Sequence, residues 1–175
     1  MNLGDTAPSF SLPATDGNTY ALADYSAADV LVVVFTCNHC PYAVALQGRV
    51  ADFARAYADR NVRVVAICSN DPVRYPADNF DAMRARAQQE GFPFPYLHDA
   101  TQEVARAYDA TCTPDFFVFD ADHTLAYRGR FDDNWRDPDA VTQRDLPAAV
   151  DALLAGARPA PEQAAAVGCS IKWKY

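Results

Sequence analysis

The sequence predicts an α/β fold in which a mixed central β-sheet is flanked by helices on both faces. Short apolar runs at 30–35 and 62–68 have the pattern of strands buried on both sides, and a helical pattern separates them. Strand patterns at 115–119 and 125–128 flank a polar turn and predict an antiparallel hairpin. A strand-helix-strand unit followed by a hairpin gives parallel and antiparallel neighbours in one sheet.

The remaining elements follow from turn signals and apolar spacing. A short N-terminal β-hairpin is expected, because strand-like segments at 10–12 and 20–22 flank the turn residues at 16–18. From His39 to about Arg60, apolar residues recur every three or four positions, as on one face of a helix. The other expected elements are helices at 80–89, 101–108 and 146–154 and a short strand at 96–98.

The predicted organisation is one domain with a C-terminal extension. Half of the 175 residues are hydrophobic, which is enough for one core without disulfides or metals. No repeat or flexible linker interrupts residues 1–156, which we assign to the domain. Residues 157–175 end in Ile171, Trp173 and Tyr175, which alternate with lysines as in a strand. We expect this tail to dock on the domain.

Charge and hydropathy exclude two classes of partner. A net charge of -8 would repel a phosphate backbone, so we expect no nucleic-acid partner. No apolar stretch approaches the ~20 residues that span a bilayer, and the first residues lack the pattern of a secretory signal. We therefore expect a cytoplasmic protein with no membrane partner.

The chemistry of the chain centres on Cys37-Asn38-His39-Cys40, which follows the buried strand and opens the next helix. Two cysteines at this spacing bring their sulfur atoms close enough to form a disulfide. The free N–H groups of a helix N-terminus and a protonatable His39 both favour a thiolate on Cys37. We predict Cys37 as the nucleophile, Cys40 as the resolving thiol and His39 as the residue that lowers the pKa of Cys37.

An isolated CxxC pair also occurs in zinc and iron–sulfur sites. A structural zinc site needs four ligands, however, and the chain has no second CxxC and no HxxxH. We expect no metal and no other cofactor.

A second informative element is Thr113-Pro114, directly before the strand at 115–119, because a proline begins or borders a strand. A CxxC after the first core strand and a proline before the strand of the final hairpin together resemble the thioredoxin superfamily. The resemblance implies a cis proline that faces the disulfide, with Thr113 and Pro114 binding substrate. Asn38, between the two cysteines, is a further candidate for substrate binding.

More narrowly, the chain resembles the peroxiredoxin-like redoxin proteins of that superfamily over essentially its whole length. Five separated stretches in the same order carry the resemblance: residues 34–42, 69–71, 94–99, 111–117 and 168–174.

The motif differs from that of a peroxidase in this family. Such an enzyme places a Thr or Ser three residues before its reactive Cys, and an Arg near the later strand. Here Cys37 occupies the place of that Thr, and Arg128 or Arg130 would have to supply the positive charge. Dithiol exchange is therefore expected ahead of peroxide reduction.

Other polar and sulfur-bearing residues could line the same site. Cys112 lies two residues before Pro114, and Cys169 would approach Cys37 if the tail docks, so both are candidate redox thiols. Asn70 and Asp71 follow a parallel strand at its carboxyl end, on the same side of the sheet as the dithiol. Each also has a purely structural alternative. Cys112 would be a core cysteine, the tail would only cover an edge of the sheet, and the two polar residues would cap a turn.

Three functions follow, in order of preference. The first is a thiol–disulfide oxidoreductase that exchanges disulfides with protein or small-molecule thiols. The second is a thiol peroxidase that reduces peroxides through a sulfenic acid. The third is a copper-binding module on the same fold, in which His98 or His123 would supply a third ligand. The sequence predicts neither the physiological partner nor the oligomeric state.

Overall fold

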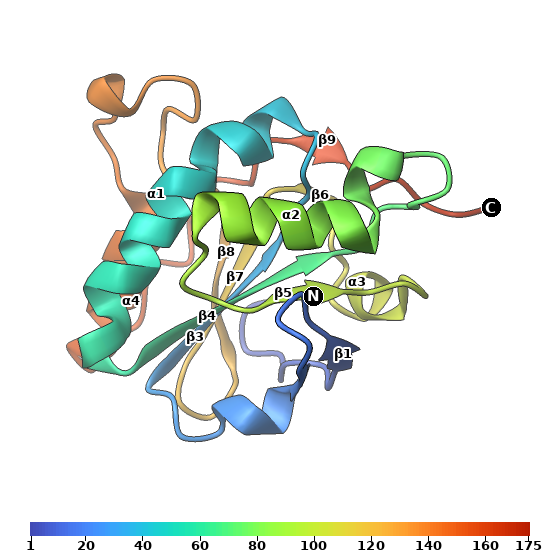
Figure 1. Cartoon of the computed structure of the whole chain (residues 1–175). Coiled ribbons are helices and arrows are strands. Elements are labelled where there is room, and N and C mark those ends of the chain that lie inside the picture. The colour runs from blue at the N-terminus through green and yellow to red at the C-terminus, as the bar shows by residue number, and fades with distance from the viewer.

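A computed structural model describes all residues, 1–175, and is built around a five-stranded mixed sheet (Figure 1). The strand order is β5-β4-β3-β7-β8, in which the first three strands are parallel and the last two antiparallel to their neighbours. The bounds are β3 Val30–Phe35, β4 Val62–Cys68, β5 Tyr96–His98, β7 Asp115–Phe119 and β8 Leu125–Gly129. All five strands lie where the sequence predicts them.

The central strand β3 explains why the sheet is mixed. All six of its residues are buried, as expected for a β-branched run covered on both faces. One edge pairs in parallel with β4, and the other pairs antiparallel with β7, with Val33 opposite Val65 on one side and Phe117 on the other. The carboxyl end of β3 therefore lies beside the start of β7.

Helices cover both faces of this sheet, which confirms the predicted fold class (Figure 1). One face packs against α1 Pro41–Tyr57, α2 Phe80–Glu90 and α4 Asp145–Leu154. The other packs against the N-terminal segment and the short helix α3 Glu103–Ala107. No helix is both long enough and apolar enough to cross a membrane.

Two small ribbons flank the main sheet. The strands β1 Ser11–Pro13 and β2 Thr19–Ala21 form the predicted N-terminal hairpin, with Gly17 in the turn at φ +88°. The strands β6 Cys112–Thr113 and β9 Cys169–Ser170 form the second ribbon, which joins the tail to the segment before β7.

The tail is held against the domain by side chains of mixed character. Ile171 is buried in the core on the α3 face, and Trp173 lies under the guanidinium of Arg106 at 4.5 Å. Tyr175 is fully exposed. The strand-like alternation expected at the end of the chain therefore gives a true strand only at residues 169–170.

The largest difference from the predicted boundaries is at the start of α1. The helix was expected from His39, but it begins at Pro41, and Cys40 is its N-cap with an extended backbone. Proline favours the first helical position and disfavours a helical conformation in the residue before it. Cys37 therefore lies in the loop before the helix, three residues ahead of the N-cap.

Candidate active site

The two cysteines of the CxxC motif lie where the chain leaves β3 and enters α1. Both are buried, with Cys37 exposed by 4% and Cys40 by 0%, and both are free thiols. His39, between them, keeps 29% of its side chain exposed.

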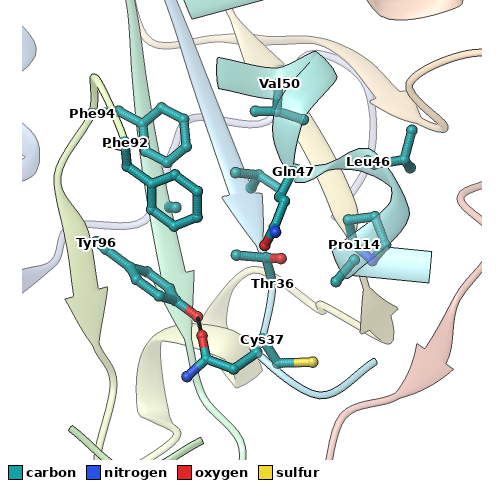
Figure 2. A pocket seen from close by; sticks show the side chains of 13 residues that line it. Thr36, Cys37, Leu46, Gln47, Val50, Phe92, Phe94, Tyr96 and Pro114 are labelled. Carbon is teal, nitrogen blue, oxygen red and sulfur yellow. Dashed lines mark hydrogen bonds between the residues drawn. The ribbon is translucent and has the colours of Figure 1, made fainter. Parts of the chain in front are cut away.

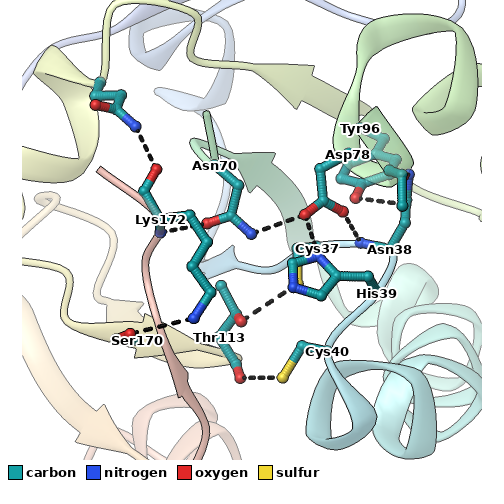
Figure 3. A network of polar contacts seen from close by, with 12 residues as sticks. Cys37, Asn38, His39, Cys40, Asn70, Asp78, Tyr96, Thr113, Ser170 and Lys172 are labelled. Atoms are coloured by element: carbon teal, nitrogen blue, oxygen red, sulfur yellow. Dashed lines mark hydrogen bonds and ion pairs between the residues drawn. The ribbon is translucent and has the colours of Figure 1, made fainter. Parts of the chain in front are cut away.

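Thr113 contacts both sulfur atoms from the opposite side (Figure 3). Its Oγ1 is 3.4 Å from Cys37 Sγ, and its carbonyl oxygen lies 3.2 Å from Cys40 Sγ. The peptide bond between Thr113 and Pro114 is cis, as the resemblance implies. The two motifs that the sequence analysis singled out therefore meet at one site.

The environment of the two sulfurs favours a negative charge on Cys40. A hydrogen bond from the Cys37 thiol lowers the pKa of Cys40 most, and the backbone N–H groups of Ala43 and Cys169 lower it further. The same bond to Cys40 raises the pKa of Cys37, followed by burial and the nearby carboxylate of Asp78. The pKa of Cys40 is therefore the lower of the two in the reduced pair.

The lower pKa lies on Cys40, whereas the sequence had led us to expect it on Cys37, and the roles of the two cysteines stay predictions. Cys37 was predicted to carry the thiolate at the helix N-terminus, with its pKa lowered by His39. Because α1 begins only at Pro41, the free N–H groups of its first turn meet Cys40 instead. The carboxylate of Asp78 further opposes a thiolate on Cys37.

The sequence analysis missed Asp78, which organises the active-site loop (Figure 3). Its side chain is fully buried and accepts hydrogen bonds from the Asn38 backbone N–H at 2.7 Å and from Asn70 Nδ2 at 2.9 Å. The oxygen that accepts from Asn70 also pairs with Nδ1 of His39, whose ring stacks on Tyr75. A buried carboxylate with three donors fixes both the loop and the imidazole.

Local sequence gives little warning of this role. Asp78 ends the short 3-10 turn Pro76–Asp78 and precedes Asn79, the N-cap of α2, so it has the pattern of an ordinary acidic residue at a helix start. Its partner His39 is 39 positions away. Only the packing of the turn against the dithiol loop reveals the contact.

The polar residues predicted at the site form hydrogen bonds with other parts of the protein. Asn38 was predicted to bind substrate, which stays a prediction; its amide donates to the Ala77 carbonyl at 2.9 Å and accepts from Tyr96 Oη at 2.9 Å. Asn70 links Asp78 to the tail, since its Oδ1 accepts from the Lys172 N–H at 2.8 Å. Asp71 caps a turn through Val73 N–H.

The tail brings Cys169 to the dithiol. Cys169 lies directly opposite Thr113 in the β6/β9 ribbon, and its sulfur faces Cys40. The sequence had led us to expect Cys37 as its neighbour. Cys112 belongs to the same ribbon, but its buried thiol turns to the carbonyl of Pro114 at 3.8 Å. Burial raises the pKa of Cys112 to about 11, which is typical of an inert core cysteine.

A small apolar cavity of about 20 Å³ adjoins Cys37, between α1 and β5 (Figure 2). This volume is close to that of one water-sized molecule. Its walls are mostly apolar, with Leu46 and Val50 on α1, Phe92 and Phe94 before β5, and Pro114 at the dithiol.

The groups needed by the alternative functions lie elsewhere. His98 stacks on Phe80, and His123 contacts the carbonyl of Tyr25 at 3.1 Å, so neither was placed with the dithiol. A different set, Cys37, His39 and Asp78, has ligand atoms within 4.8 Å of one another, although His39 and Asp78 already pair with each other.

The two arginines suggested for peroxide chemistry are engaged in other ion pairs. Arg128 pairs with Asp115 at 3.2 Å and Arg130 with Asp145 at 2.9 Å. Asp115 itself is buried in this pair and has no hydrogen bond to Cys37 or Cys40.

Comparison with known proteins gives one family and several close structures. The Redoxin family model matches residues 2–144. A candidate peroxiredoxin of Mycobacterium tuberculosis is 31% identical over 111 residues, which are 61% of this chain and 63% of that protein. The chain therefore aligns with less than two thirds of the length of this relative.

Solved structures extend the similarity to the whole chain. An uncharacterized conserved protein from Geobacillus kaustophilus is 45% identical with a TM-score of 0.94, covering 98% of this chain and 92% of that one. A hypothetical protein from Sinorhizobium meliloti is 42% identical with the same TM-score, covering 99% and 96%.

More distant structures share only the thioredoxin-like fold. A peroxidoxin from Mycobacterium tuberculosis is 21% identical with a TM-score of 0.63, covering 89% of this chain and 95% of that one. A thiol:disulfide interchange protein from Chlorobium tepidum is 23% identical with a TM-score of 0.62, covering 71% and 84%.

Proposed function

This chain belongs to the redoxin family, and we propose that it is a thiol–disulfide oxidoreductase whose reactive pair is Cys37 and Cys40. One observation carries the proposal: the two sulfurs of the CxxC motif are buried at one place, with Thr113 in contact with both. Such a pair is one two-electron oxidation away from a disulfide.

In this proposal the two cysteines exchange the roles expected from sequence. The Cys40 thiolate attacks a disulfide sulfur of the substrate and forms a mixed disulfide, and the substrate's other sulfur leaves as a thiolate. Cys37 then attacks the Cys40 sulfur and closes the Cys37–Cys40 disulfide. The second substrate sulfur leaves, and the proton of Cys37 ends on it. The substrate is reduced by two electrons and the pair is oxidised.

His39 serves this chemistry as a proton carrier beside the pair. Its Nδ1 is held by Asp78 and its ring is stacked on Tyr75, so its orientation is fixed while part of the ring stays exposed. An imidazole held in this way can exchange protons between the thiols and water. The proposed compartment is the cytosol, and the proposed partners are protein or small-molecule thiols and disulfides.

A thiol peroxidase is the second candidate, because Cys40 occupies the N-cap of α1 and its pKa is lowered there. Peroxide would oxidise this sulfur to a sulfenic acid, and Cys37 would condense with it and release water. The engagement of Arg128 and Arg130 in ion pairs with aspartates speaks against fast peroxide reduction.

The test is a redox titration of the reduced protein in a series of glutathione buffers, with the Cys37–Cys40 disulfide quantified by peptide mass spectrometry. We expect a reversible disulfide that is lost in Cys37→Ser and in Cys40→Ser but retained in Cys112→Ser. Absence of this disulfide from the wild-type protein would refute the dithiol mechanism.

Peroxide consumption by the same proteins separates the two candidates. Dithiol exchange predicts slow consumption of hydrogen peroxide beside fast reduction of a small disulfide such as oxidised glutathione. Fast peroxide consumption that depends on Cys40, with slow disulfide reduction, would replace the first candidate by the second.

A further inference from the structure

The reactive pair is difficult for a partner to reach. Cys37 and Cys40 are 4% and 0% exposed, whereas Cys169 is the one cysteine of the five that is not buried. Thiol–disulfide exchange requires direct contact between the sulfurs, so a protein dithiol reaches the more exposed Cys169 more easily than it reaches Cys37 or Cys40. The most accessible sulfur at this site therefore belongs to the tail.

The register of the β6/β9 ribbon directs Cys169 toward the dithiol. Residues opposite each other in an antiparallel pair point to the same side of the ribbon, and their neighbours point to the other. Thr113 faces the dithiol, with Oγ1 3.4 Å from Cys37 Sγ, and Cys169 lies opposite Thr113. Cys112 and Ser170 form the next pair and point away.

Cys40 is the central sulfur of the three. It faces Cys37 on one side and Cys169 on the other, and it also receives the backbone N–H of Cys169. A disulfide between Cys37 and Cys40 would leave the third sulfur next to Cys40, which is the atom it must attack in an exchange reaction.

The tail is held in this position by several hydrogen bonds (Figure 3). The Lys172 N–H donates to Asn70 Oδ1 at 2.8 Å, and the Lys172 carbonyl accepts from the Asp71 N–H at 2.8 Å and from Gln102 Nε2 at 2.9 Å. Gly168 lies so close to β6 that a Cβ added there would be 2.1 Å from the Thr113 carbonyl oxygen. The docked tail therefore holds Cys169 close to the dithiol.

Resting on the proposed dithiol function, we propose that Cys169 is a third redox thiol, which takes the disulfide over from Cys37 and presents it to an external dithiol reductant. The Cys169 thiolate attacks Cys40 Sγ, the Cys37–Cys40 bond breaks, and Cys37 leaves as a thiolate that takes up a proton. The product is a Cys40–Cys169 disulfide, with no net change in oxidation state.

The reductant completes the cycle at the exposed sulfur. One thiolate of the dithiol attacks Cys169 Sγ and releases Cys40 as a thiolate. The second thiol of the reductant then attacks the mixed disulfide, leaves as a closed disulfide, and returns Cys169 to the thiol form. Two electrons pass from the reductant to the protein, which regains its three free thiols.

The charges at the site favour ionisation of Cys169 only after the Cys37–Cys40 disulfide has formed. In the reduced protein, burial and the neighbouring Cys40 raise the pKa of Cys169, whereas Lys172 lowers it. Oxidation of Cys40 into a disulfide removes its negative charge and its hydrogen bond with Cys169. The Cys169 thiol then ionises more readily, at the stage when its thiolate is needed.

The first experiment traps the proposed disulfide. Cys37→Ser is treated with diamide, a thiol oxidant, and digested without reduction for peptide mass spectrometry. We expect the dominant product to link Cys40 to Cys169. Cys37→Ser combined with Cys112→Ser should give the same product. A dominant Cys40–Cys112 link, or no internal link at all, would overturn the proposal.

The second experiment measures the cycle. Wild type, Cys169→Ser and Cys112→Ser are oxidised to the Cys37–Cys40 disulfide and then reduced by dithiothreitol, a small dithiol, with the free thiols followed over time. Cys169→Ser should slow reduction by about ten-fold or more, and Cys112→Ser should change it by less than about two-fold. Equal rates for Cys169→Ser and wild type would overturn the relay.

Failure of the relay differs from failure of the proposed function. If Cys169→Ser forms the Cys37–Cys40 disulfide in glutathione buffers and is reduced as fast as wild type, the dithiol function stands and the relay is wrong. If wild type forms no Cys37–Cys40 disulfide, the dithiol function is wrong, and with it the relay that depends on it.

Discussion

The two small ribbons of this protein are built in opposite ways. The β1/β2 ribbon joins segments separated by a single tight turn, with Gly17 at φ +88° supplying the conformation that the turn needs. The β6/β9 ribbon joins Cys112–Thr113 to Cys169–Ser170, more than fifty positions further along the chain. The first ribbon lies away from the dithiol. The second ribbon contains Cys169 and contacts Cys37 and Cys40 through Thr113.

The comparison shows that the local ribbon serves the core and the non-local ribbon serves the site. Leu12 of β1 is buried against the α3 face of the sheet, so the hairpin contributes apolar burial. Thr113 and Cys169 bury little apolar surface, but they place a hydroxyl, a carbonyl and a third thiol around Cys40. Changes in the two ribbons should therefore have different consequences.

The largest effect is expected from Gly168→Ala. The added Cβ would lie 2.1 Å from the Thr113 carbonyl oxygen, so β9 must move away from β6, and we expect a loss of about 3 kcal/mol in the free energy of unfolding. Urea denaturation measures the loss. The diamide-induced Cys40–Cys169 link should disappear in the Cys37→Ser background.

Gly17→Ala in the other ribbon is the matched control for Gly168→Ala. No atom lies within 4 Å of the added Cβ, and only the positive φ is unfavourable, so we expect a loss of about 1 kcal/mol. The disulfide chemistry should stay intact. If both variants lost the Cys40–Cys169 link equally, the distinction between the two ribbons would not hold.

Asp78→Asn should have the next largest effect, because this carboxylate supports the dithiol loop and, through Asn70, the tail. The new amide NH₂ group would face other hydrogen-bond donors at a fully buried position. We therefore expect a loss of about 2 kcal/mol in the free energy of unfolding. Disulfide formation should also slow, since His39 loses its acceptor.

Asp81→Asn is the control for Asp78→Asn. Asp81 is 89% exposed and pairs only with Arg84 on the surface of α2, so its loss should leave stability nearly unchanged. Equal effects of the two substitutions would mean that the buried network around Asp78 has no special role.

The lowered pKa of Cys40 predicts a pH dependence of stability in the reduced protein. The pKa of Cys40 is lowered in the folded state, so below the ordinary thiol pKa of 9.0 the unfolded chain binds one proton more. Stability from this group is complete above that pH and is lost as pH falls toward the folded pKa of Cys40. The slope approaches about 1.4 kcal/mol per pH unit.

The measurement compares urea denaturation of reduced wild type and Cys40→Ser between about pH 6 and about pH 8. Wild type should gain stability with rising pH relative to the variant. Above the ordinary thiol pKa the raised pKa of Cys37 reverses the trend, because the folded state then retains the extra proton. Parallel curves in the lower range would contradict a thiolate on Cys40.

The smallest effect is expected from Tyr20→Phe in the β1/β2 ribbon. Tyr20 Oη donates to Asp16 at 2.5 Å, but the pair is exposed to water, so its removal should cost about 0.5 kcal/mol or less. Thermal denaturation and the glutathione titration should both give nearly wild-type values. A changed redox potential would show that the N-terminal ribbon influences the site.

Much of the site was predictable because its two motifs have strong local patterns. Cys37 and Cys40 follow an unmistakable buried strand, and Thr113-Pro114 precedes another, so their meeting follows from the pairing of β3 with β7. The lowered pKa of Cys40 was missed because α1 begins two residues later than predicted, at Pro41, which places Cys40 at the N-cap. Asp78 was missed because nothing near it in sequence marks it as buried.

The sequence by itself determined the five strands of the main sheet, the main helices and the fold class, because apolar periodicity and turn residues act over a few neighbouring positions. Its resemblance to the thioredoxin superfamily implied that Cys37, Cys40 and Thr113 belong to one site. Only the tertiary structure decided that the first turn of α1 lowers the pKa of Cys40, that Asp78 fixes His39, and that Cys169 faces Cys40 while Cys112 turns away. These depend on the register of segments far apart in the chain, and a register that differs by one residue directs the opposite side chain to the site.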